Sequence, residues 1–126
     1  MQSLNDMLHK WENTKDIALA SDICNMLSDR YGVFSEVKDW GIDKGLNDPK
    51  AQLNKVIEEV GEIAHEICRN RFDSDELVDA LGDTTVTLVI LADILGYDLV
   101  DCLKQSYDVI KDRKGRTVNG TFVREA

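Results

Sequence analysis

The chain has 126 residues with a formal net charge of −9, 43% hydrophobic residues and a single proline. This length suits one domain with one core, and the scarcity of proline suits a helical protein. The acidic balance argues against non-specific binding to nucleic acid, which needs positive surface. The longest uncharged apolar run, residues 84–92, is too short to span a bilayer, so no membrane partner is expected.

The three cysteines, Cys24, Cys68 and Cys102, lie far apart and lack the spacing of a metal site. No targeting pattern is visible at the N-terminus. We therefore expect reduced thiols in a cytoplasmic protein.

The first helical region covers residues 3–30. It carries two apolar stripes that are out of phase, which predicts either one helix or two. Thr14 or Ser21 could cap the restart of a second helix. Turn residues at Tyr31-Gly32 predict a break, followed by a short helix over residues 35–41.

Three clearer helices follow. Asp48-Pro49 supplies an N-cap and a proline at the first helical position, which predicts a helix over residues 49–69. The next helix begins near residue 74 and ends at Gly96. The last covers residues 99–112, with Leu103 and its stripe facing inward. The tail shows no convincing strand pair, so we predict an all-α fold, an antiparallel bundle of four to five helices.

The second half of the helix over residues 74–95 is apolar almost all round. A helix of this kind is buried on all sides. In a domain this small, such burial usually takes a partner subunit as well as neighbouring helices. The pattern therefore predicts a homo-oligomer.

Acidic residues border the apolar stripe that the helix over residues 49–69 is expected to bury. Glu59 and Glu62 lie on one side of it, although like charges one turn apart repel each other. On the next helix, Asp79 and Asp83 also project from one side. Carboxylates on buried helices need a partner or a metal. Either these are solvated acidic faces, or two antiparallel helices form an oxygen-rich site that suits Mg²⁺ or Mn²⁺ and does not suit Zn²⁺.

Two short motifs contain these acids. EEVGE at residues 58–62 has the pattern EExxE, and DALGD at residues 79–83 is close to ExxD. The frame around them includes a preceding Trp, a following apolar run and the KDRKG and NG segments of the tail. Together they resemble the MazG-like nucleoside triphosphate pyrophosphohydrolases. The resemblance covers about residues 33–126, a catalytic helical domain, and leaves residues 1–32 as a helical extension without an assigned role.

One position departs from the family pattern. Counting back from Asp83, the Glu of ExxD falls on Ala80. Asp79 could supply that carboxylate from one residue earlier. Alternatively, the stretch from Glu76 to Asp79 is itself an ExxD. The resemblance supports Glu59, Glu62 and Asp83 best and leaves Asp79 and Glu76 in competition for the remaining place.

The resemblance implies an all-α NTP pyrophosphatase-like fold that assembles as dimers or tetramers. It also implies Mg²⁺-dependent hydrolysis of nucleoside or deoxynucleoside triphosphates to monophosphate and pyrophosphate, in house-cleaning of the nucleotide pool. Glu58 or Glu59 would take the proton of the attacking water, although Glu58 could equally be a solvated surface residue. The implied metal ligands are Glu59, Glu62, Asp79 and Asp83.

Phosphate charge that the metal does not neutralise needs basic side chains nearby. Lys55 lies one turn before Glu59, either as its ion-pair partner or as a phosphate ligand. Residues 111–116 hold four basic side chains in six, which either balance a helix C-terminus or contact phosphate. Trp40 could stack on a base or lie in the core. The candidate substrate-binding residues are thus Lys55, Trp40, Lys111, Arg113, Lys114 and Asn119.

Two other functions stay open at this point. One is a dUTP-specific or phosphoribosyl-ATP-specific member of the same superfamily, which would share the acidic frame. The other is a non-catalytic helical oligomer that binds nucleotide or metal. Ala80 is the feature that favours the second.

Overall fold

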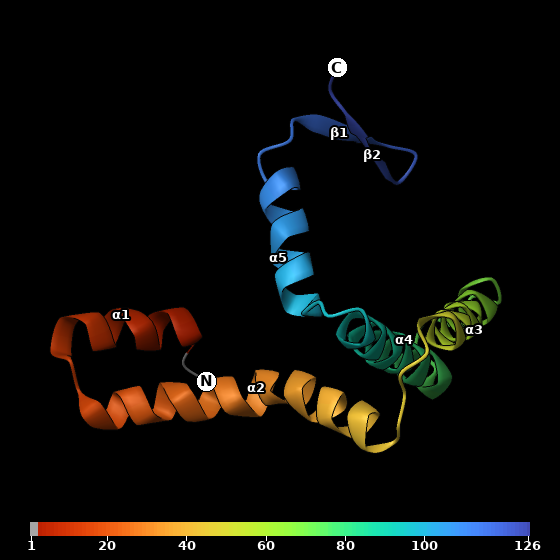
Figure 1. Cartoon of the computed structure of the whole chain (residues 1–126). Coiled ribbons are helices and arrows are strands. Elements are labelled where there is room, and N and C mark those ends of the chain that lie inside the picture. Colours follow the sequence, from red (N-terminus) through yellow and green to blue (C-terminus); the bar gives the residue numbers. More distant parts are fainter. Residues whose placement is uncertain (1–2) are drawn as a thin grey trace. The chain divides into compact units, whose positions relative to one another are not determined.

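The computed structural model describes residues 3–126, and within them the chain forms five helices and one β-hairpin (Figure 1). It divides into two compact units, the first ending at Leu46 and the second beginning at Asn47. The predicted all-α fold is confirmed, because the only strands in the described part are two short ones. The elements are α1 (Leu4–Thr14), α2 (Ile17–Asp43), α3 (Pro49–Ile67), α4 (Asp75–Ile94), α5 (Leu99–Ile110), β1 (Gly115–Val118) and β2 (Thr121–Arg124).

The first unit is a helical hairpin of α1 and α2 around a small apolar core of Met7, Leu19 and Ile23. The restart of the helix is confirmed, but its N-cap is Asp16 and not Thr14 or Ser21. The Asp16 carboxylate accepts a hydrogen bond from the Ala18 backbone N–H at 2.9 Å.

The break predicted at Tyr31-Gly32 is wrong, because α2 runs through it without interruption. A glycine inside a helix costs only about 1 kcal/mol relative to alanine, and no proline stands nearby to stop the helix. The boundary suggested at residue 32 therefore falls within α2. The alternative that placed Trp40 in the core is also wrong within the described chain, because Trp40 is 51% exposed.

The second unit is organised by α3 and α4, which pack side by side in antiparallel directions (Figure 1). The expected caps are present. Asp48 accepts a hydrogen bond from the Lys50 N–H at 3.0 Å, which starts α3, and Ser74 accepts one from the Leu77 N–H at 3.1 Å, which starts α4. Gly96, with φ of +81°, ends α4 as predicted. No helix in residues 3–126 is long and apolar enough to cross a membrane.

The face of α5 that was expected to point inward is exposed. Leu103, Tyr107 and Ile110 all lie on the surface, and none of the residues of α5, all of them described, is buried. The stripe was identified correctly as apolar, but the second unit leaves it exposed.

The prediction that the tail contains no strand pair is wrong. β1 and β2 form an antiparallel hairpin in which Val118 pairs with Thr121. Asn119 and Gly120 connect them with φ of +50° and +79°. Two positive φ values are what a type I′ turn requires, and Asn-Gly is its preferred sequence. The Asn-Gly dipeptide predicts a hairpin more strongly than the short strands argue against one.

We predict that Asp48→Ala lowers the free energy of opening of the first turn of α3 by about 1 kcal/mol, since two backbone N–H groups lose their acceptor. Native-state amide exchange at Lys50 and Ala51 measures this. Asp48→Asn is the control and should keep most of the protection, because asparagine also caps helices. Unchanged exchange in the alanine variant would show that the cap does not stabilise α3.

Candidate functional site

The side of α3 that faces α4 carries three buried polar residues, with the half-buried Val56 and Ile63 between them. Gln52, Glu59 and Glu66 are the buried residues of α3, and each is seven positions from the next. This corrects in part the expectation that α3 buries its apolar stripe and leaves the acids at the border, since Val56 and Ile63 of that stripe are half-buried while Glu59 is buried. Ile57 and Val60 of that stripe are 60% and 48% exposed. We call Gln52, Glu59 and Glu66 the polar seam.

Both ends of the polar seam are bonded to α4 or to the turn before it. At one end, the Gln52 side-chain N–H donates to the backbone carbonyl of Thr87 at 3.2 Å. At the other, the Ser74 hydroxyl donates to Glu66 at 3.3 Å, and the Arg71 guanidinium lies 3.6 Å from the second carboxylate oxygen of Glu66. The polar atoms that these two side chains bury therefore have partners.

The middle of the seam differs from its ends. Glu59 is only 9% exposed, and its Oε2 is buried without a hydrogen-bond partner in the described residues. Burial raises the pKa of Glu59, and the negative charges of Glu62 and Asp83 raise that pKa further, while Lys55 opposes them. A buried carboxylate under these conditions favours either a proton or a cation.

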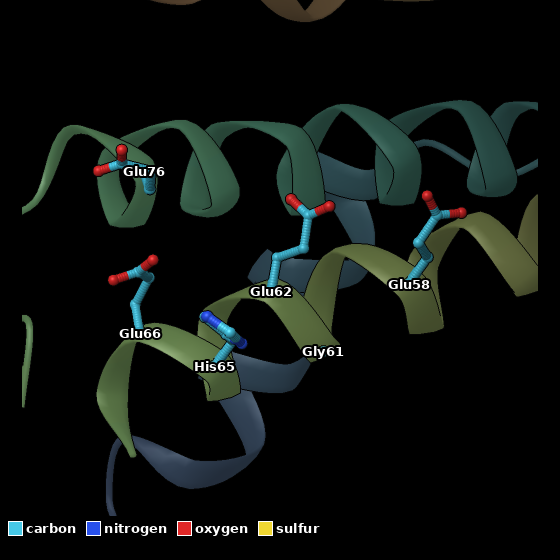
Figure 2. Close-up of a pocket in the computed structure, with 6 residues that line it drawn as sticks. All are labelled: Glu58, Gly61, Glu62, His65, Glu66 and Glu76. Atoms are coloured by element: carbon cyan, nitrogen blue, oxygen red, sulfur yellow. The ribbon is translucent and has the colours of Figure 1, made fainter. Parts of the chain in front are cut away.

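A cavity of about 400 Å³ adjoins this arrangement. Figure 2 shows Glu62 and Glu66 reaching from α3 toward α4, where Glu76 lies close to Glu66. The lining is strongly acidic, with a single imidazole among the carboxylates. The residues that line it are Glu58, Gly61, Glu62, His65, Glu66 and Glu76.

The predicted metal ligands are only partly brought together. Glu59 lies close enough to Glu62 and Asp83 to feel both charges. Asp79 is exposed on α4 and is absent from the lining of the cavity, whereas its competitor Glu76 is part of that lining. Ala80, at the place of the motif Glu, is 1% exposed.

Lys55 has a different partner from the one expected. Its ammonium group donates to Glu58 at 3.0 Å, three residues on, and not to Glu59. This hydrogen bond is the main reason that the pKa of Lys55 is raised. Glu58 therefore lines the cavity and also forms an exposed ion pair with Lys55.

The remaining predicted substrate residues lie outside the acidic cavity. Lys111 pairs with Asp108 at 3.3 Å, close to the C-terminal end of α5. Trp40 belongs to α2, in the first unit. The others are exposed residues of the tail, with Asn119 in the hairpin turn: Arg113, Lys114 and Asn119.

Sequence reasoning assigned no role to Gln52 or to the contacts of Glu66. The available signal was their spacing of seven from Glu59, which places all three on one line along a helix. This spacing is usually diagnostic when the residues are apolar, and these three residues are polar.

Residues 47–117 match the family model of the MazG nucleotide pyrophosphohydrolase domain. The chain belongs to this family. The matched MazG segment starts where the second unit starts, includes the whole of α3, α4 and α5, and ends in β1. No curated protein and no solved structure matches the chain.

MazG pyrophosphohydrolases generally depend on divalent metal, and the side chains present fit such an ion. The donors around Glu59 are all carboxylate oxygens, and its Oε2 has no protein partner in the described residues. Within residues 3–126, no three acidic, His or Cys side chains converge closely enough to hold a metal alone. Mg²⁺ commonly uses only one or two carboxylates together with water and substrate phosphates. The arrangement is therefore compatible with an ion that arrives with its substrate.

We predict that Glu59→Gln raises the melting temperature at pH 7.5 in EDTA, because it removes a buried charge that its neighbours repel. The folded-state pKa of Glu59 is raised above the ordinary value of 4.5. Its contribution to stability is therefore complete below pH 4.5 and is lost as pH rises through the folded pKa. The advantage of the glutamine variant should accordingly disappear at pH 4.

Thermal unfolding followed by circular dichroism at both pH values measures this difference. Glu58→Gln is the matched control, since Glu58 is exposed and paired with Lys55, and it should give no gain. An unchanged or lower melting temperature for Glu59→Gln at pH 7.5 would show that Glu59 is not strained.

Proposed function

We propose that this protein is a Mg²⁺-dependent pyrophosphohydrolase that cleaves nucleoside or deoxynucleoside triphosphates to monophosphate and pyrophosphate. The observation that supports this best is Glu59, buried and without a hydrogen-bond partner in the described chain, beside the charges of Glu62 and Asp83. These residues lie within the segment that matches the MazG domain. A cation bound there would remove the repulsion among the carboxylates, and a triphosphate could then approach them.

Glu59, Glu62 and Asp83 are the proposed metal ligands. For the remaining place we favour Glu76 over Asp79, because Glu76 lines the same cavity as Glu62. When bound, Mg²⁺ neutralises phosphate charge and lowers the pKa of a coordinated water. The carboxylates of this chain would orient that ion and the phosphates relative to each other.

Glu58 is the proposed proton acceptor, since it lines the cavity and its side chain is half exposed, within reach of water. Glu59 is better suited to the metal because it is buried. In the reaction, the water oxygen bonds to the α-phosphorus, and the bond from that phosphorus to the bridging oxygen breaks. Pyrophosphate leaves with the electron pair, and the proton of the water passes to Glu58.

Basic and aromatic side chains would hold the rest of the nucleotide. Lys55 stands beside Glu58, where its charge could meet a phosphate. The basic tail would supply further contacts through Lys111, Arg113 and Lys114, with Asn119 in the turn. Trp40, half exposed, remains the proposed stacking partner of the base.

A second copy of the chain is the proposed partner. The exposed stripe of α3 consists of Leu53, Ile57, Val60 and Ile67, spaced four, three and seven apart, as in a coiled-coil seam. The stripe itself contains no charge, so packing two copies of it together would bury none of its residues as a charged group. Monomers rarely leave a continuous apolar stripe exposed. A dimer, or a tetramer of two such dimers, would cover it.

We predict that the protein converts triphosphates to monophosphate and pyrophosphate with Mg²⁺ and not with EDTA. Each common NTP and dNTP is incubated separately, and ion-exchange chromatography identifies the products. Glu62→Gln should lower kcat by about 10²-fold or more, the scale for losing an electrostatic stabiliser, and should keep the fold. Asp73→Asn is the control, an exposed acid outside the cavity lining, and should keep its activity.

The other products have definite meanings. Diphosphate and phosphate as products would still identify a hydrolase, but they would exclude cleavage between the α- and β-phosphates. Turnover confined to dUTP or phosphoribosyl-ATP would identify a specialised member of the superfamily. No turnover of any nucleotide would favour a non-catalytic oligomer, for which the buried Ala80 is the specific argument.

We predict that Ile57→Glu dissociates the oligomer, because it places a charge in the middle of the apolar stripe of α3. Light scattering coupled to size exclusion should then report the monomer mass of 14.2 kDa. Val109→Glu is the control, as it is exposed on α5 and lies off the stripe of that helix. A wild-type protein that is itself a monomer would exclude the proposed assembly.

A further inference from the structure

We propose that Gln52 and Glu66 are positioning residues, which hold α3 in register against α4 so that Glu59 stays buried and available to a cation. The inference rests on the proposed cation-binding role of Glu59.

The spacing gives the first argument. Gln52 and Glu66 each lie seven residues from Glu59, which is about 10.5 Å along a helix. One is bonded to the Thr87 carbonyl and the other to the Ser74 hydroxyl, near opposite ends of the contact between the helices. A slide of α3 along α4 by one turn would break both contacts together. The two bonds therefore define one register.

Stability alone does not favour buried polar side chains at these positions. Apolar residues of similar size at such positions usually stabilise a helix pair as well or better than buried polar groups do. Single polar residues in a packed seam are instead known to specify register. Gln52 and Glu66 are both buried and both bonded, which is the arrangement that such a role requires.

Ser74 strengthens the link at the Glu66 end. Its hydroxyl donates to Glu66 and also accepts the Leu77 backbone N–H at 3.1 Å. Since Ser74 is the N-cap of α4, Glu66 is connected to the first turn of that helix. Arg71 holds the other oxygen of Glu66 from the turn between the helices. The starting point of α4 and the end of α3 are thus tied to each other.

This register also determines which residue lies opposite Glu59. Glu59 lies seven residues after Gln52 on α3, and Ala80 lies seven residues before Thr87 on α4. Because the helices are antiparallel, this register brings Ala80 level with Glu59. Ala80 has only a methyl group to offer, and the Oε2 of Glu59 has no partner in the described residues. The two bonded ends therefore keep the middle carboxylate opposite a position that cannot neutralise it.

The test uses the full chain with Mn²⁺ as the probe, its binding measured by electron paramagnetic resonance. Gln52→Leu should leave the melting temperature unchanged or higher and weaken Mn²⁺ binding by about 10- to 100-fold, the range for partners that orient metal ligands. In turnover it should lower kcat with little change in KM. Asn54→Leu is the matched control, the same kind of substitution at an exposed position of α3. It should leave the melting temperature and the Mn²⁺ affinity unchanged.

Glu66 needs two variants because it also lines the cavity. Glu66→Gln can still accept the Ser74 hydroxyl and should retain Mn²⁺ affinity, whereas Glu66→Leu should lose it as Gln52→Leu does. Equal losses in Glu66→Gln and Glu66→Leu, with Gln52→Leu unaffected, would make Glu66 a metal ligand and overturn its positioning role.

The outcomes separate this inference from the proposed function. A wild-type protein that binds Mn²⁺ and turns over triphosphate, with a Gln52→Leu variant that does both equally well, overturns the positioning role and leaves the function standing. A wild-type protein that neither binds Mn²⁺ nor turns over triphosphate overturns both.

Discussion

The packing of α3 against α4 buries the carboxylate of Glu59 among other negative charges, and the candidate site depends on this contact. A charged group loses much of its hydration when it is buried, and the loss is recovered only through partners of opposite charge or through hydrogen bonds. Oε2 of Glu59 has no hydrogen-bond partner in the described chain, and the positive charge of Lys55 offsets the repulsion from the other acids only in part. The free energy of this arrangement is therefore set by what binds there as much as by the fold.

The rest of the hairpin compensates for that local cost. The helices begin at strong caps, Asp48 and Ser74, and the polar seam is hydrogen-bonded at both ends. The second half of α4 contributes apolar burial through residues such as Val89 and Ile90. The stable contacts thus surround the strained one. This division suits a binding site, because the scaffold can stay folded before the ligand arrives.

Exposed apolar surface links the site to assembly. The stripe that includes Ile57 and Val60 lies on α3, the helix that also carries Glu59 and Glu62, and it adjoins the polar seam. Any chain that packs on this stripe would therefore also restrain α3. The exposed face of α5 shows the same imbalance between apolar composition and burial within one chain.

Periodicity identified the stripes correctly but not their neighbours. The apolar stripe of α3 was predicted to face the core, yet only Val56 and Ile63 of it are half-buried, and the fully buried residues of α3 are polar. A helical pattern shows which residues share a face, and it does not show which face meets another helix. The same limit explains Lys55, whose expected ion-pair partner was Glu59. The structure shows the pair with Glu58.

The sequence by itself determined the local features: the starts of α3 and α5, the end of α4 at Gly96, the helical class and the motif that contains Glu59 and Glu62. Caps and turns depend on the backbone preferences of a few neighbouring residues, so a short stretch is enough to specify them. Only the tertiary structure decided that Glu76 and not Asp79 lines the cavity, and that Gln52 and Glu66 bond across to α4 and its N-cap. These facts depend on the register between two helices, which arises from contacts through space between residues distant in the chain.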